Sequence, residues 1–349
     1  MSESATRGRP GRPTILDVAA LSRVSKSTVS NVLRGTGTVS PTTRDRVLAA
    51  ISALGYRPNV LARNLVQQRT HTLGVVVGDL ANTFYAELVK LLEREASDRA
   101  YTTIVCNTDG HAEREAARIE SLLEHRVGGI LLLQFSGDRS IVSQLVVEQV
   151  PLVVVSCWDE RLDCVAVDDR AGMALAVDHL ADLGHQRIGY ISGWVVERET
   201  DVARHDGYER AMLRRGLTVD ADHAVWWDEG EAQRAATDEA VRRVLGAPQP
   251  PTAFVASNDY NAIRLLDALE RLGARVPQDI SVVGFDGIEL AGLTRIGLTT
   301  VAQPREQMAA VAVGALVEWI EETGEIERLQ VRLDPELIVR TSTAPPGGR

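Results

Sequence analysis

The chain has 349 residues, of which 44% are hydrophobic and 25% charged, and its formal net charge at pH 7 is −10, a balance typical of a globular protein with about two or three domains. The sequence argues against membrane, secreted and disulfide-stapled proteins, because it has no apolar run of roughly 18 residues, no apolar segment near its N-terminus and no CxxC pair among its three cysteines. We therefore expect a cytoplasmic protein with no membrane partner.

Positive charge is concentrated at the N-terminal end of the chain. Residues 1–69 contain 11 Lys and Arg against 3 Asp and Glu, a formal charge of +8, which leaves 27 against 45, or −18, for the remainder. A basic segment on an acidic protein is typical of a module that binds nucleic acid, and a solubilising basic tail is the alternative. Residues 1–13, rich in Gly and Pro, are expected to form a disordered basic tail.

Three short helices are predicted within residues 14–57. The first follows a capping box made by Thr14 and Asp17. The second covers residues 26–34 and ends before a glycine, and the third follows a Ser-Pro pair and also ends at a glycine. Because about three residues separate the first two helices, the pattern predicts a helix-turn-helix unit that binds DNA.

The second predicted helix has a polar face and an apolar face when residues are placed at 100° steps. A helix in the major groove needs donors toward the base edges and small side chains near phosphates. Lys26 can donate to guanine and Asn31 can pair with adenine, whereas Ser25, Thr28 and Ser30 suit phosphate contacts. A polar surface helix without a ligand is the alternative.

The stretch TILDVAALSRVSKSTVSNVLRGTGTVSPTTRDRVLAAISALGYRPNVLARNL resembles the headpiece of the lactose and galactose repressor (LacI/GalR) family, through the patterns VSxxTVSxVLN, TRxxVxxAxxxLGYxPN and ARxL. The resemblance implies base-reading roles for Lys26, Ser27 and Asn31. It implies phosphate contacts for Thr14, Ser25, Thr28 and Ser30. Arg23 departs from the family, which usually has glycine there, and if the turn requires positive φ, arginine costs roughly 1 kcal/mol relative to glycine.

Residues 58–69 are predicted to form a hinge helix and linker. About two helical turns are too short to be stable alone, so we expect this helix to form only against a partner. Asn59 can cap this helix. By resemblance, two copies meet over the operator centre: Ala62 lies where the helices cross and Leu65 enters the minor groove. Two such headpieces would read a pseudo-palindromic site, and a passive linker is the alternative.

From residue 71 onward, short apolar runs alternate with longer amphipathic segments, which predicts βαβ units with parallel strands. Polar residues end several apolar runs, and such positions lie at the carboxyl edge of an open α/β sheet, where ligands bind. These strand-end residues are Asp79, Asn107, Gln134, Ser156, Ser192, Asn258, Asp259 and Asp286. The pattern predicts a small polar ligand.

The motifs of common enzymes are missing from the sequence. There is no GxGxxG after a strand, no GxxxxGK[ST], no GxSxG and no HExxH, and the seven histidines are scattered. Asp168 and Asp169 could serve as an acid and base pair, but no nucleophile candidate lies beside them and binding explains them equally well. We expect no catalytic residue, no metal site and no cofactor.

The acidic body resembles the two-lobed, periplasmic-binding-protein-like effector domain of the same family, through motifs such as VDDRAG, HLADLGHQRIGYISG and VPQDISVVGFDG. The resemblance implies an effector-binding and dimerisation domain at residues 70–342, followed by a flexible tail at 343–349. It implies effector contacts from Phe84, Tyr85, Asp169, Arg204, Asn258 and Asp286. These guanidinium, amide and carboxylate groups suit the hydroxyls of a sugar. Side chains that could stack on it are Trp158, Trp194, Trp226 and Trp227, with core packing as the alternative.

Together these features predict an effector-responsive transcription regulator, with repression as the expected activity. Its fold would be an all-α helix-turn-helix headpiece plus an α/β, two-lobed, type I periplasmic-binding-protein-like domain with parallel sheets. We expect it to act at the nucleoid, binding double-stranded operator DNA as a homodimer or higher oligomer, with a carbohydrate effector changing DNA affinity. An activator or effector-independent regulator is the first alternative, and a solute-binding protein or sugar enzyme is the second.

Overall fold

The structure is a computed structural model that describes residues 13–34, 36–56, 70–133, 145, 149–193, 199–227, 233–321 and 327–347. The chain divides into two units, Met1–Thr70 and His71–Arg349. The predicted hinge residues Asn59, Ala62 and Leu65 lie outside the described residues. No helix in the described part of the chain is both long and apolar enough to cross a membrane.

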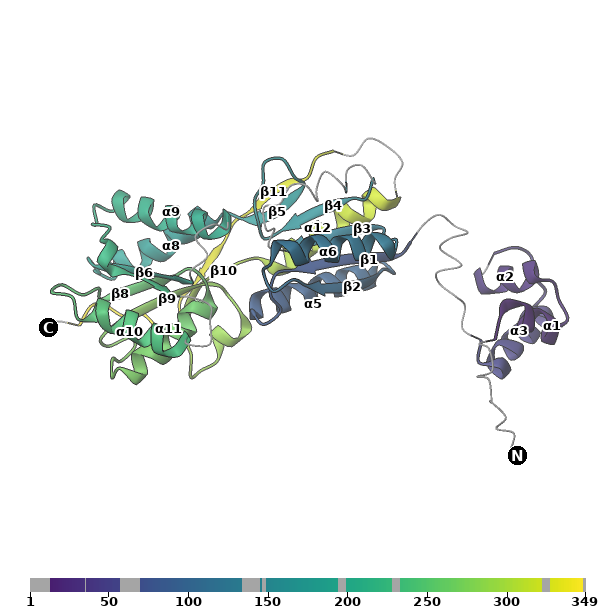
Figure 1. Ribbon diagram of the computed structural model, residues 1–349, viewed down its shortest axis with the longest axis horizontal. Helices are drawn as coiled ribbons and strands as arrows, with labels where there is room; N and C mark the ends of the chain where they lie inside the picture. The colour runs from purple at the N-terminus through teal and green to yellow at the C-terminus, as the bar shows by residue number, and fades with distance from the viewer. Residues whose placement is uncertain are drawn as a thin grey trace, which may run out of the picture. The chain divides into compact units, whose positions relative to one another are not determined.

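Residues 13–34 and 36–56 of the first unit form three helices (Figure 1): α1 (Ile15–Ser22), α2 (Lys26–Arg34) and α3 (Pro41–Leu54). The Thr14 hydroxyl accepts a hydrogen bond from the Asp17 backbone N–H, and the Asp17 carboxylate accepts one from the Thr14 N–H, which is the predicted capping box. Small apolar side chains from all three helices form the core: Val18, Ala19, Val29, Val32, Val47 and Ala50. The predicted helix-turn-helix headpiece is confirmed.

The turn between α1 and α2 holds an arginine in the left-handed region. Arg23 has φ +52° and ψ +46°, and the next residue, Val24, donates its backbone N–H to the carbonyl of Ala19 at 3.1 Å. This arrangement closes the end of α1 in the way that a glycine usually does. The turn therefore has the left-handed conformation that favours glycine. The Cβ of Arg23 raises the free energy of this conformation above that of a glycine at the same position.

The second unit contains two six-stranded sheets, each the centre of a lobe (Figure 1). The sheet of lobe 1 has the order β11-β5-β4-β3-β1-β2, and all neighbouring strands in it are parallel. Its strands are β1 (Thr72–Val77), β2 (Thr102–Asn107), β3 (Gly129–Leu133), β4 (Leu152–Val155), β5 (Cys164–Val167) and β11 (Gln330–Leu333). The apolar runs at β1, β3, β4 and β5 are buried because helices cover both faces.

The sheet of lobe 2 has the order β12-β10-β9-β8-β6-β7. Its strands are β6 (Ile188–Gly193), β7 (Ala224–Trp227), β8 (Ala253–Ala256), β9 (Ser281–Asp286), β10 (Thr299–Ala302) and β12 (Glu336–Ile338). Strand β12 is antiparallel to β10, and the remaining pairs are parallel. The predicted two-lobed α/β fold with mainly parallel sheets is confirmed.

Helices cover both sheets on either side. Lobe 1 carries α5 (Thr83–Asp98), α6 (Ala112–Glu124) and α12 (Arg305–Glu321), and lobe 2 carries α8 (Asp169–Asp182), α9 (Glu199–Arg214), α10 (Gln233–Leu245) and α11 (Asp259–Arg271). Along β1, Val75 packs in the same core as α5 and α12, whereas Val76 packs in the same core as α6, as alternation along a strand requires. The chain passes between the lobes after β5, after β10 and after β11.

The C-terminal residues correct one expectation. The hydroxyl of Thr343 lies 3.0 Å from Nε2 of His179 on α8, and the backbone N–H of Ala344 donates to the Ser281 hydroxyl at 3.0 Å. Nε2 of His185 lies 2.9 Å from the carbonyl oxygen of Ala344. Thr343 and Ala344 are therefore part of lobe 2, and the prediction of a flexible tail from residue 343 is wrong for them, because partners far away in the sequence hold them.

Candidate functional site

The candidate DNA-binding face lies on α2 and its N-terminal cap. Ser25 accepts a hydrogen bond from the Thr28 backbone N–H at 3.1 Å, and its hydroxyl lies 2.7 Å from that of Ser27 and 2.8 Å from that of Thr28. Lys26 and Ser27 are exposed, whereas Val29 is fully buried in the headpiece core. The polar and apolar faces expected from the spacing are therefore present.

Two other predicted DNA-binding residues of α2 are less accessible. Ser30 and Asn31 are half-buried. The Asn31 carbonyl accepts the backbone N–H of Thr36 at 3.1 Å, and a Cβ at Gly37 would stand 3.2 Å from Asn31 Nδ2. Asn31 therefore lies against the loop that follows α2, and base reading by this residue stays a prediction. Thr14 is exposed within the capping box of α1.

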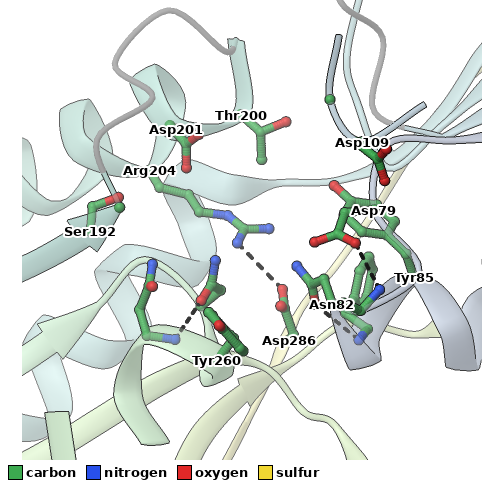
Figure 2. Close-up of a pocket in the computed structure, with 16 residues that line it drawn as sticks. Asp79, Asn82, Tyr85, Asp109, Ser192, Thr200, Asp201, Arg204, Tyr260 and Asp286 are labelled. Atoms are coloured by element: carbon green, nitrogen blue, oxygen red, sulfur yellow. Dashed lines mark hydrogen bonds and ion pairs between the residues drawn. The ribbon is translucent and has the colours of Figure 1, made fainter. Parts of the chain in front are cut away.

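A cavity of about 370 Å³ lies in the second unit, where the carboxyl ends of strands from both lobes meet (Figure 2). Its lining comprises Asp79, Ala81, Asn82, Phe84, Tyr85, Asp109, Gly110, Ser192, Gly193, Thr200, Asp201, Arg204, Asn258, Tyr260, Asn261 and Asp286. Five of the six predicted effector residues line this cavity. The exception is Asp169, which does not line the cavity but accepts a hydrogen bond from Arg204.

Arg204 is the centre of a buried network on α9. Its Nε donates to Asp169 Oδ1 at 2.7 Å, and its Nη1 donates to the Ser257 carbonyl at 2.6 Å and to Asp286 Oδ1 at 3.3 Å. Its guanidinium carbon lies 4.0 Å from the centre of the Phe285 ring. Burial lowers the pKa of Arg204, but the charges of Asp169 and Asp286 more than offset it, so this arginine remains a cation.

The two carboxylates that share Arg204 have raised pKa values. Burial raises the pKa of Asp169, and burial raises that of Asp286 to about 6, although in both cases the charge of Arg204 acts in the opposite direction. Asp286 also accepts a hydrogen bond from Gln303 Nε2 at 2.7 Å. Its φ of +119° is a costly backbone conformation for a non-glycine residue. Asp286, the last residue of β9, therefore combines a strained backbone with a buried carboxylate.

A third buried carboxylate lies behind the cavity. Asp259, the first residue of α11, accepts the Thr300 hydroxyl at 2.5 Å and the Ile288 backbone N–H at 2.9 Å. Burial and the charge of Asp286 raise its pKa to about 8. Asp259 does not line the cavity but supports the wall that carries Asp286.

The wall from lobe 1 begins at the end of β1. Asp79 Oδ1 accepts the Ala81 backbone N–H at 2.8 Å, and Asn82 Oδ1 accepts the Phe84 N–H at 3.1 Å, which caps α5. The rings of Phe84 and Tyr85 meet edge to face, with their centres 5.2 Å apart. Figure 2 shows Asp79, Asn82 and Tyr85 facing Arg204 and Asp286 across the cavity.

The structure tests which strand-end residues gather at the cavity. Asp79, Ser192, Asn258 and Asp286 do, whereas Asn107 instead bonds to the Leu80 backbone N–H and to Asp109. The lining residues that sequence reasoning missed include Asp109, Thr200, Asp201 and Tyr260. Asp109 follows a recognised strand end by two residues, so a wider window there could have found it. Tyr260 follows the recognised strand end at Asn258 by two residues, so the same window could have found it. Thr200 and Asp201 belong to the first turn of α9 and carry no such signal.

The two tryptophan side chains that the structure describes among the four candidates do not line the cavity. Trp158 stacks with Arg332, whose guanidinium carbon is 3.9 Å from the ring centre. Trp226 packs near Tyr190, with ring centres 5.8 Å apart. The side chains of Trp194 and Trp227 lie outside the described part of the structure. Within that part, no set of three or more His, Cys, Asp and Glu side chains is placed to hold a metal ion.

Known families match both units of the chain. Residues 14–59 match the model described as "Bacterial regulatory proteins, lacI family", and residues 177–343 match the "Periplasmic binding protein-like domain". The ribose operon repressor of Escherichia coli is 35% identical over 334 residues, which cover 94% of this chain and 99% of that protein. The chain belongs to the LacI family of bacterial regulatory proteins.

Solved structures of the LacI family share the fold. The Lac repressor dimer bound to operator and the anti-inducer ONPF has a TM-score of 0.83 at 26% identity, with 96% of this chain and 100% of that chain covered. A complex of the transcriptional regulator CelR with cellobiose has a TM-score of 0.69 at 31% identity, with 95% and 100% covered. The relatives of this LacI-family chain are thus transcriptional regulators.

Proposed function

We propose that this chain is an effector-responsive transcriptional repressor that binds a pseudo-palindromic operator as a homodimer and a sugar in the cavity of its second unit. One observation carries the proposal: the cavity is lined by polar side chains from both lobes, with Asp79 and Asn82 on one side and Arg204, Asn258 and Asp286 on the other. A ligand that contacts both lobes has a different binding free energy in each lobe arrangement. It can therefore shift the population that binds DNA.

The headpiece supplies the DNA contacts in this proposal. Lys26, Ser27 and Asn31 read bases, and Thr14, Ser25, Thr28 and Ser30 contact phosphates. The hinge residues Asn59, Ala62 and Leu65 complete the DNA-binding set, with Leu65 as the minor-groove wedge. The +8 formal charge of residues 1–69 supports this division of roles, because phosphate contacts dominate affinity for DNA.

The cavity suits a sugar because its donors and acceptors are fixed in place. Arg204 and Asp286 are buried and hydrogen-bonded to each other, and Asn258 is held as the cap of α11. Phe84 and Tyr85 supply apolar surface beside these groups. The ribose operon repressor and the CelR complex, by their names, support a carbohydrate as the ligand class.

We further propose that the protein acts in the cytoplasm without catalytic activity. The candidate acid and base pair supports binding instead. Asp168 caps α8 by accepting the Ala171 backbone N–H at 3.0 Å, and Asp169 is held by Arg204. Neither side chain lines the proposed sugar cavity; both line a neighbouring cavity of about 390 Å³ instead.

The test uses the full-length protein. Duplexes selected from a random library should share two half-sites related by a two-fold axis. The dissociation constant of the selected operator, measured by fluorescence anisotropy, should change when ribose, cellobiose or another member of a sugar panel is added. Absence of preference for any duplex over random competitor would contradict the proposal.

A variant of the cavity makes this test specific. Tyr260 is exposed and lines the cavity without joining the Arg204 network. The variant Tyr260→Ala should raise the sugar concentration needed to shift operator binding by about three- to tenfold, because an aromatic contact that ligand binding buries is worth roughly 0.5 to 1.5 kcal/mol. The matched control is Leu213→Ala, at an exposed position of α9 outside the cavity. If the two variants need the same sugar concentration to shift operator binding, the sugar does not contact Tyr260.

A further inference from the structure

Carboxylates from both lobes converge on the cavity. Asp79 and Asp109 line it from lobe 1, and Asp201 and Asp286 line it from lobe 2 (Figure 2). Arg204 is the single cationic side chain among the lining residues that the structure describes. The described lining therefore carries four acidic side chains and one basic side chain, and one of the four acids, Asp109, forms an ion pair with Arg114, which does not line the cavity.

The positive charge of Arg204 is already balanced within the protein. The guanidinium is 5% exposed, and its bonds to Asp169 and Asp286 place it between two carboxylates. Asp201, one helical turn before it on α9, adds further negative potential. An arginine has five N–H donors, so Arg204 can still donate to a hydroxyl, but it offers no net positive charge to an anion.

Two helix N-termini at the cavity are occupied by side chains of the protein itself. The cap of α5 is the amide oxygen of Asn82, and the cap of α11 is the amide oxygen of Asn258, which accepts the Asn261 backbone N–H at 2.8 Å. A helix N-terminus is a common binding place for phosphate or carboxylate. At α5 and α11, an amide oxygen takes one of the backbone donors that an anion would use.

We propose that the effector is a polyhydroxylated compound without an anionic group, and that Asp79 and Asp201 exclude its phosphorylated and carboxylated derivatives. The inference rests on the proposed function of the cavity and adds the chemical class of its ligand. An uncharged sugar leaves the balance between Arg204 and its carboxylates intact. An amino sugar gains from the surrounding carboxylates, whereas a sugar phosphate is repelled by them.

The experiment compares matched ligands on the full-length protein by calorimetry. The sets are ribose with ribose 5-phosphate; glucose with glucosamine and glucose 6-phosphate; and adenosine with adenosine 5′-monophosphate, alongside a panel of uncharged sugars. In each set that binds, the phosphorylated member should bind at least tenfold more weakly than its parent. Raising the salt concentration should reduce this ratio, because salt screens the carboxylates.

Variants of the lining residues test the cause of the selectivity. The double variant Asp79→Asn with Asp201→Asn should reduce the ratio between phosphorylated and parent ligand about three- to tenfold. The control is Glu120→Gln, which removes one negative charge from an exposed position of α6 outside the cavity and should leave the ratio unchanged. A ratio unchanged in the double variant overturns the assignment of these carboxylates.

The two proposals fail in different ways. A phosphorylated ligand that binds as tightly as its parent overturns the present inference and leaves the proposed function standing. Absence of binding by every member of the sets and of the panel contradicts the proposed function, and the inference falls with it.

Discussion

Arg204 and the carboxylates around it show how a few residues set the properties of the cavity. One guanidinium is shared by Asp169 and Asp286, and Asp259 lies behind them with Thr300 and a backbone N–H as its partners. Breaking a buried ion pair leaves a charge without compensation, which costs several kcal/mol. The residues of this network therefore maintain the stability of lobe 2 as well as the shape of its binding surface.

Asp259 should make the unfolding free energy depend on pH. Its pKa is raised to about 8 by burial, so between about pH 4 and pH 8 the folded chain binds a proton that the unfolded chain does not. The stability that this group contributes is fully present below its unfolded pKa and is lost as pH rises through about 8. Urea unfolding at several pH values should show that Asp259→Asn reduces this loss.

Two further variants serve as controls for the pH dependence of stability in Asp259→Asn. Asp286→Asn should reduce the loss of stability over a lower range, from about pH 4 to about pH 6, because burial raises the pKa of Asp286 to about 6. Glu120→Gln, on the surface of α6, should leave the profile as it is. If Asp259→Asn retains the full wild-type decline up to pH 8, Asp259 is ionised in the folded protein.

The sequence could predict single residues only where a local pattern carries the information. Asp286 and Asn258 follow apolar runs, and both lie at the cavity. Asp169 follows such a run too, but the approach of α9 places Arg204 between it and the cavity. Thr200 and Asp201 reach the cavity because distant strands position α9, and no local pattern records that arrangement.

At the scale of elements, caps and turns determine where helices begin and end. Spacing alone predicted α1, α2 and α3, since each is marked by a hydroxyl cap or a turn residue. The antiparallel addition of β12 to β10 was not predictable, because an edge strand that returns after a crossover has no signal of its own. The order of residues 343 and 344 was not predictable either, because their hydrogen-bond partners His179, His185 and Ser281 lie far away in the sequence.

Replacement of Arg23 by glycine should stabilise the headpiece. The residue has φ +52°, which glycine adopts without the steric cost of a Cβ, so Arg23→Gly should gain about 1 kcal/mol. Amide hydrogen exchange of α1 and α2 in the full-length protein should slow accordingly. The matched control, Arg44→Gly at an exposed position inside α3, should lose about 1 kcal/mol, because glycine disfavours a helix interior. Faster exchange in Arg23→Gly would show that the arginine side chain stabilises the turn.

At the scale of the whole molecule, hydrogen bonds join the lobes in addition to the three chain segments that pass between them. Glu87 on α5 of lobe 1 accepts the backbone N–H of Glu289 in lobe 2 at 3.0 Å, and it forms an ion pair with Arg305, the first residue of α12, which also belongs to lobe 1. Arg305 also donates to the carbonyl of Gly287 at 2.8 Å, directly after Asp286. This link connects lobe 1 to the segment of lobe 2 that carries a cavity residue.

Weakening this link should change the coupling between sugar and DNA. Glu87→Gln removes the ion pair within lobe 1 that holds Arg305 in position for its contact with the Gly287 carbonyl of lobe 2, and it should lower the unfolding free energy by about 1 to 3 kcal/mol. It should also reduce the ratio of operator dissociation constants with and without sugar, because the ligand then acts on lobes that are held less firmly. Glu306→Gln, at an exposed position beside Arg305, is the control. Equal ratios in wild type and Glu87→Gln would show that the link has no part in the response.

The three passages of the chain between the lobes have a consequence for synthesis on the ribosome. Lobe 1 receives α12 and β11 only after nearly all of lobe 2 has been made, and lobe 2 receives β12 last of all. Neither sheet can be completed by a nascent chain that stops before residue 330. Truncated products of this kind lack the last strand of both sheets and expose unpaired strand edges. We expect chaperones and proteases to act on them as incompletely folded chains.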